Sequence, residues 1–128
     1  MKPELMYLSW SVLLSIAHML ATVVALFAHS GLMVTVGNRA NLPELPGWGG
    51  RAARANANMS QNLVLFAAVV LAVVVTGTTN STTLQGAQIF FYARVAYAVF
   101  YLVGVPWLRT GSWLVSIAGI LMILSQLK

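Results

Sequence analysis

The sequence predicts an all-α integral membrane protein, a bundle of four transmembrane helices that run up, down, up and down. The 128 residues are 59% hydrophobic and only 7% charged, whereas soluble domains carry about 25% charged residues. Long apolar runs alternate with short segments rich in Gly, Pro, Asn and Thr. Because one span needs about 20 residues, the chain has room for four spans in a single domain, residues 1–128.

Three connections separate the expected spans, which cover about residues 5–36, 51–76, 84–103 and 112–127. The first connection is GNRANLPELPGWGG, whose prolines and glycines predict an ordered loop, and the second is the polar turn GTTNST. Pro106 marks the third, GVPWLRTG. The N-terminal apolar run is too long for a signal peptide and has no A-x-A-type cleavage site, so we expect it to be a span.

The basic residues predict the orientation in the membrane. Four spans place both termini on one side, with Lys2 and Lys128, and the first and third connections on the other. That other side holds Arg39, Arg51, Arg54 and Arg109. The positive-inside rule then places these two connections in the cytoplasm. The net charge of +5 has no Lys/Arg cluster, which indicates topology and anion binding and not nucleic-acid binding.

Two polar stripes are predicted on neighbouring spans. Arg51, Arg54, Asn58 and Gln61 are spaced 3, 4 and 3 residues apart, so a helix places them on one face. On the third span, Arg94, Tyr97 and Tyr101 likewise share a face. Polar groups in lipid are costly, and each stripe should therefore face protein or a water-filled cavity.

Arg94 is a cation inside the membrane without an acid at its depth. Glu4 and Glu44, the only carboxylates, are expected near the membrane surfaces. Because the second and third spans are antiparallel, Gln61 should lie at the depth of Arg94, in the same chain or across a subunit boundary. Gln61 can accept a hydrogen bond but cannot neutralise the charge. A small ligand with carboxylates could, since guanidinium binds carboxylate in a bidentate fork.

Other chemistry has weaker support. Ser11, Ser15, His18 and Thr22 form a modest polar stripe on the first span, best explained by interhelical hydrogen bonds. His29 lies eleven residues beyond His18, too far for the two to hold one metal, so no metal site is expected. The chain has no cysteine, which excludes disulfides and a cysteine nucleophile. Snorkelling of the interfacial arginines to anionic lipid is the alternative to a ligand pocket.

Two segments resemble one known family. They are GNRANLPELPGWGGRAARANANMSQNLVLFAAVVLA and ARVAYAVFYLVGVPWLRT. The pattern R-A-x-x-N-x-x-E before an apolar run, and R-x-x-Y-x-x-x-Y followed by an arginine at the fourth helix, are similar to the MAPEG family, the membrane-associated proteins in eicosanoid and glutathione metabolism. The resemblance is greatest to short bacterial members and covers about residue 38 to the C-terminus.

The resemblance implies a homotrimer in the bacterial inner membrane, with glutathione sites between subunits near the cytoplasmic side. It implies that glutathione, the co-substrate, binds at Arg54, Asn58, Gln61, Arg94, Tyr97 and Tyr101, with Arg51 and Arg39 at the rim. Arg109 matches the family arginine proposed to stabilise the glutathione thiolate, the catalytic role. Gln61 departs from the usual glutamate, which leaves more positive charge in the site, and Asn56 stands where many members have histidine or another polar residue.

The expected function is therefore that of a membrane-bound glutathione-dependent transferase or peroxidase acting on hydrophobic, lipid-like electrophiles. The alternative is a non-catalytic protein of the same fold that binds anionic lipid or another anionic ligand. A small transporter or channel has little support, because no span is broken and none carries an acid at mid-depth.

Overall fold

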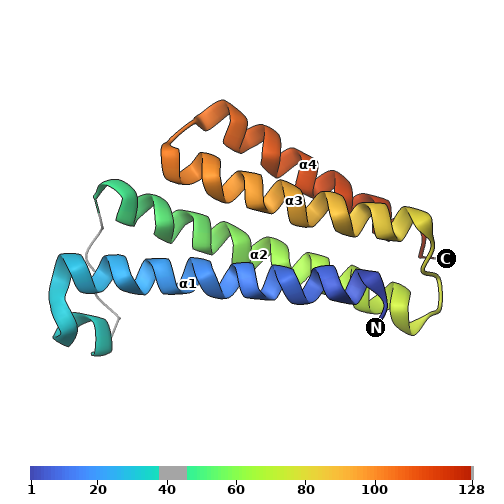
Figure 1. The fold of residues 1–128 in the computed structure, drawn as a ribbon, viewed down its shortest axis with the longest axis horizontal. Helices are drawn as coiled ribbons and strands as arrows, with labels where there is room; N and C mark the ends of the chain where they lie inside the picture. Colours follow the sequence, from blue (N-terminus) through green and yellow to red (C-terminus); the bar gives the residue numbers. More distant parts are fainter. Residues whose placement is uncertain (38–45, 128) are drawn as a thin grey trace.

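The computed structural model describes residues 1–37 and 46–127, and its four helices form an antiparallel bundle (Figure 1). The helices are α1 (Pro3–Val36), α2 (Gly47–Val75), α3 (Ser81–Val103) and α4 (Pro106–Leu124). Both ends of the chain lie at the same end of the bundle (Figure 1). The all-α, up-down-up-down fold class is confirmed. Arg39, Glu44 and Lys128 lie outside the described residues.

All four helices are long and apolar enough to cross a membrane. They contain 34, 29, 23 and 19 residues in chain order. Many of their large apolar side chains point outward, among them Leu13, Val64 and Leu121, each more than half exposed. Outward apolar side chains on every helix are what a lipid environment requires, and the chain is an integral membrane protein.

All four helices begin earlier than the predicted spans, and the shift is largest for α2 and α4. Helix α2 starts at Gly47 instead of residue 51, and α4 starts at Pro106 instead of residue 112. Proline suits the first helical position because its fixed φ is helical and its missing N–H would have no partner there. Gly104, in the left-handed conformation at φ 77°, ends α3 two residues earlier. Arg109 therefore lies in the first turns of α4 and not in the third connection.

Helix α1 is interrupted near its end. Gly31 has φ 83° and ψ 177°, values that are not helical and that only glycine adopts readily. The last residues of α1 consequently leave the line of the helix, as the turn at the far end of α1 in Figure 1 shows.

The core lies in the half of the bundle nearer the termini. The rings of Phe66 (α2) and Phe90 (α3) stack with their centroids 3.9 Å apart, and both side chains are completely buried. Helices α3 and α4 touch backbone to backbone. A Cβ added to Gly119 would lie 2.6 Å from the carbonyl oxygen of Gly86. The aromatic stack holds α2 against α3, and the glycine contact holds α3 against α4. Together they fix the relative positions of these three helices at the opposite end of the bundle, where the arginines lie.

Candidate functional site

The two predicted polar stripes meet at one depth. The Arg54 Nε on α2 donates a hydrogen bond of 3.1 Å to the Tyr101 hydroxyl on α3. Helix α2 runs away from this end of the bundle and α3 runs toward it (Figure 1). Arg54 and Tyr101 therefore lie at the same depth in the bundle.

Three arginines from three helices gather around two tyrosines. The Arg109 guanidinium carbon lies 4.7 Å from the centroid of the Tyr101 ring, and that of Arg94 lies 4.1 Å from the centroid of Tyr97. The two rings are themselves 5.4 Å apart. Cations over aromatic faces are attracted by the ring quadrupole. We call Arg54, Arg94, Tyr97, Tyr101 and Arg109 the arginine–tyrosine cluster.

The five residues of the arginine–tyrosine cluster differ in how deeply they are buried. Arg54 is exposed and Arg109 is half-buried, whereas Tyr97 and Tyr101 retain only 5% and 6% of their exposure. Arg94 is completely enclosed, at 0%, and its three guanidinium nitrogens have no hydrogen-bond partner among the described residues. Arg54 is therefore the most accessible arginine of the cluster, whereas Arg94 lies enclosed against the Tyr97 ring.

Gln61 does not meet Arg94 within one chain. The Gln61 side chain is exposed, whereas Arg94 is inaccessible. The structure turns Asn62 inward instead, 5% exposed, and its Nδ2 donates to the backbone oxygen (2.8 Å) and to Oδ1 (3.2 Å) of Asn58. Sequence reasoning missed Asn62. The signal was its spacing of three and four residues from the apolar residues Met59 and Phe66, which places it on the core face.

The polar stripe of α2 lies on the outside of a single chain. Arg54 and Gln61 are exposed, and Arg51 and Asn58 are half-buried. Two buried atoms of this region, Arg51 Nε and Asn56 Oδ1, have no partner among the described residues. Lipid offers no hydrogen-bond partner to the exposed Arg54 and Gln61 side chains. This surface therefore needs contact with protein, water or a polar ligand.

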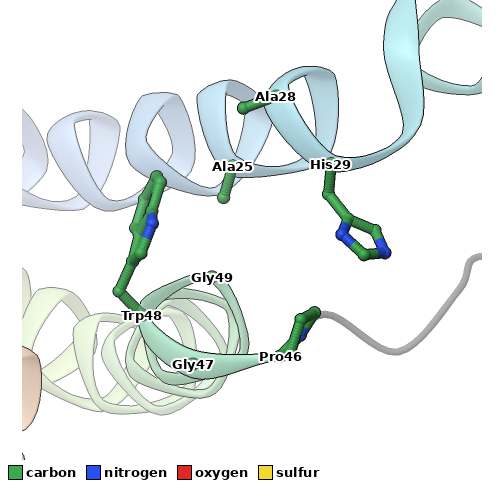
Figure 2. A pocket seen from close by; sticks show the side chains of 7 residues that line it. All are labelled: Ala25, Ala28, His29, Pro46, Gly47, Trp48 and Gly49. Carbon is green, nitrogen blue, oxygen red and sulfur yellow. The ribbon is translucent and has the colours of Figure 1, made fainter.

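A separate cavity of about 360 Å³ lies between α1 and the first turn of α2. Figure 2 shows His29 and Trp48 on its two sides, with Pro46 and Gly47 along the start of α2. None of the residues that line it belongs to the arginine–tyrosine cluster. His29 is exposed here, while His18 is buried in the bundle, so the two histidines have different surroundings.

Of three comparisons with known proteins, only the comparison with family models gives a match. The comparisons with curated proteins and with solved structures find no match. The family model described as the MAPEG family matches residues 5–127, which is nearly the whole chain. The match includes all four helices and every residue of the arginine–tyrosine cluster. This chain belongs to the MAPEG family, the membrane proteins of glutathione and eicosanoid metabolism.

Proposed function

We propose that this chain is a membrane-bound, glutathione-dependent transferase or peroxidase that acts on hydrophobic electrophiles. We propose also that it works as a homotrimer in the bacterial inner membrane, with the first and third connections in the cytoplasm. The observation that carries the proposal is the arginine–tyrosine cluster, in which three helices bring guanidinium groups to one place.

The charge of the cluster suits glutathione. The tripeptide carries two carboxylates, and guanidinium binds carboxylate through two parallel hydrogen bonds. In this proposal Arg54 and the half-buried Arg51 receive the carboxylates, and Asn58 and Gln61 bind the peptide groups. Tyr97 and Tyr101 supply the inner wall. Arg94 adds positive potential from behind the wall, where low polarity makes its charge felt more strongly than in water.

Arg109 is proposed to stabilise the glutathione thiolate. Its guanidinium lies over the Tyr101 ring, next to the Arg54–Tyr101 hydrogen bond. A cation beside a thiol lowers the pKa of that thiol and increases the fraction present as thiolate, the nucleophilic form. In transfer the thiolate then forms a C–S bond to an electrophilic carbon, and the leaving group departs with its electron pair. In reduction the thiolate attacks a peroxide oxygen, the O–O bond breaks, an alcohol or water leaves, and the sulfur becomes a sulfenic acid that condenses with a second thiol and releases water. In the second case a second glutathione thiol is needed to form the disulfide product.

A groove beside Arg109 supports an apolar second substrate. The groove has a volume of about 360 Å³ and runs between α3 and α4 on their outer side. Its walls include Ala93, Ala96, Phe100, Trp107 and Leu108. Leu108, in one wall of the groove, directly precedes Arg109 in the chain, and we propose that a lipophilic molecule in the groove reaches the thiolate from this side. Small side chains on α3 and an exposed Trp107 are consistent with entry from the lipid.

The uncovered polar stripe of α2 supports assembly of the chain into a homotrimer. In a homotrimer a neighbouring subunit covers this stripe, and the glutathione site then lies between subunits. Covering the stripe with protein removes the cost of placing Arg54 and Gln61 against lipid.

The first experiment is calorimetric titration of the detergent-solubilised protein with glutathione, using the parent, Gln61→Glu and Arg54→Gln. Binding by the parent that Arg54→Gln weakens supports the proposal, and a screen of electrophiles follows. Binding by Gln61→Glu alone means that the site has moved away from glutathione. Absence of binding by all three, with anionic lipid co-purifying in the parent and lost in Arg54→Gln, favours the lipid-binding alternative.

A further inference from the structure

The groove between α3 and α4 continues into a second cavity. This cavity has a volume of about 480 Å³ and lies between α1, α3 and α4, and Ala93 and Val115 line both spaces. On α3 the joined space runs from Gln88 to Phe100, which is twelve residues or about 18 Å at 1.5 Å per residue. That length exceeds half of the hydrocarbon core, which is about 30 Å thick, and suits an extended acyl chain. We call the joined space the extended groove.

The two ends of the extended groove differ in chemistry. The end beside the start of α4 is formed largely by apolar side chains, among them Trp107 and Leu108. The other end carries Gln88 together with Tyr7 and Tyr92, whose rings lie 6.0 Å apart. No charged side chain of the described residues lines the groove at either end. The groove is therefore an apolar passage that leads to a neutral polar site.

Gln88 lies inside the membrane with hydrogen-bonding capacity to spare. It comes seven residues after Ser81, the first residue of α3, and so lies about 10 Å along the helix. A carboxamide has two N–H donors and an acceptor oxygen. Within the described chain its one hydrogen bond runs from Nε2 to the Tyr7 hydroxyl and is 3.4 Å long, beyond the usual range for such bonds. Lipid offers no further partner, and polar side chains at this depth typically mark the path of a substrate.

We propose that the extended groove binds a long-chain lipid with a neutral oxygen function, such as a hydroxyl, at the end of its chain, and that Gln88 recognises this oxygen. A carboxamide can both donate to a hydroxyl and accept from it. A carboxylate in the same place is disfavoured, because no cation lines the groove to offset the loss of its hydration.

Gln88 would then select the second substrate through a part of the molecule remote from the reacting carbon. The position of that carbon, at the Trp107 end and near Arg109, rests on the proposed function. Recognition of the lipid by the groove does not, so the two can be tested separately.

The first test measures binding of two tritium-labelled esters to the detergent-solubilised protein by scintillation proximity, without glutathione. The esters are methyl hexadecanoate and its ω-hydroxy derivative, which differ only in the terminal hydroxyl. The parent should bind both. Gln88→Leu should weaken binding of the hydroxy ester about tenfold relative to the plain ester, the effect of losing one hydrogen bond in an apolar site. Gln88 is only half-buried on a lipid-facing groove, so leucine there should leave folding intact.

Gln85 provides the matched control. It is a second glutamine on α3, about one turn earlier, and it is exposed and does not line the extended groove. Gln85→Leu should leave the ratio of the two affinities as it is in the parent. A ratio that Gln88→Leu also leaves unchanged overturns the inference. Failure of the parent to bind either ester overturns it too, and would mean that another copy of the chain or bulk lipid covers the groove.

The second test asks whether the two spaces form one groove. Val115 lines both and is 49% exposed, so a larger side chain there can be accommodated without unfolding the bundle. Val115→Phe should weaken binding of both hexadecanoate esters at least about tenfold, because part of the chain loses its burial. Methyl octanoate, short enough for the Trp107 end alone, should bind as it does to the parent. Unchanged binding of the long esters overturns the inference.

Turnover separates this inference from the proposed function. Glutathione conjugation is measured with an α,β-unsaturated hexadecenal and its ω-hydroxy derivative, using the parent and Gln88→Leu. A lower KM of the parent for the hydroxy form, lost in Gln88→Leu at unchanged kcat, supports both. A parent that shows the binding preference but conjugates neither aldehyde counts against the proposed function and supports the lipid specificity of the groove.

Discussion

Replacing Gly119 by alanine is expected to force α3 and α4 apart. The new Cβ would lie 2.6 Å from the Gly86 carbonyl oxygen and 2.9 Å from the Phe90 backbone nitrogen. Ordinary van der Waals contacts begin at 3.4 Å, so the nearest contact is about 0.8 Å too short. Both opposing atoms are backbone, which no change of rotamer can move. We expect a loss of about 1–3 kcal/mol, the usual cost of overpacking a well-packed interior.

Gly111 provides the matched control on the same helix. It is exposed, and a Cβ added to it would meet nothing within 4 Å. Gly111→Ala should therefore be neutral or stabilise the protein by up to about 1 kcal/mol, because alanine has the higher helix propensity. Unfolding in mixed micelles with increasing dodecyl sulfate, followed by tryptophan fluorescence, measures both variants. Parent-like stability in Gly119→Ala would refute the close packing of α3 on α4.

Three other substitutions test separate features. Tyr101→Phe removes the hydroxyl that accepts the hydrogen bond from Arg54 Nε but keeps the ring. It should weaken glutathione binding about fivefold in calorimetry, and unchanged affinity would show that this pair is not part of the site. Asn80→Ala removes the N-terminal cap of α3 and should lower the free energy of unfolding by about 1 kcal/mol in the same assay, whereas Asn80→Ser should stay close to the parent. Equal loss of stability in the alanine and serine variants would argue against the cap. Gln61→Glu adds a carboxylate to the exposed stripe and should tighten binding of the glutathione ammonium in low salt more than in high salt; an effect independent of salt would point to a cause other than charge.

The fold could be predicted because apolar length is a direct physical requirement for crossing a membrane. Helix ends were harder to predict. Apolar periodicity does not distinguish a loop from a helix that continues past the hydrocarbon, so the starts at Gly47 and Pro106 were missed. The sequence pattern predicts that Pro106 lies in the connection between two helices. Its role as the first residue of α4 depends on the turn at Gly104, which only the backbone shows.

For the candidate site, spacing predicted which residues share a face but not how deeply each is buried. Counting residues along two antiparallel helices paired Gln61 with Arg94, whereas the structure joins Arg54 to Tyr101. Spacing also did not predict that Asn62 turns inward beside the outward Gln61. Adjacent positions differ by about 100° around a helix, and the packing of the other helices decides which of them is covered. The enclosure of Arg94 also depends on packing between helices that are distant in sequence.

The unequal lengths of the helices have a consequence for the surrounding bilayer. At 1.5 Å per residue, the 29 residues of α2 extend about 43 Å, whereas the 19 residues of α4 extend about 28 Å. The hydrocarbon core is about 30 Å thick, so α4 has no length to spare while α2 must tilt or project beyond it. The length of α4 therefore matches the hydrocarbon thickness of membranes made of short-chain lipids best. In thicker ones the lipid would thin locally beside α4, next to the groove that is proposed to admit the second substrate.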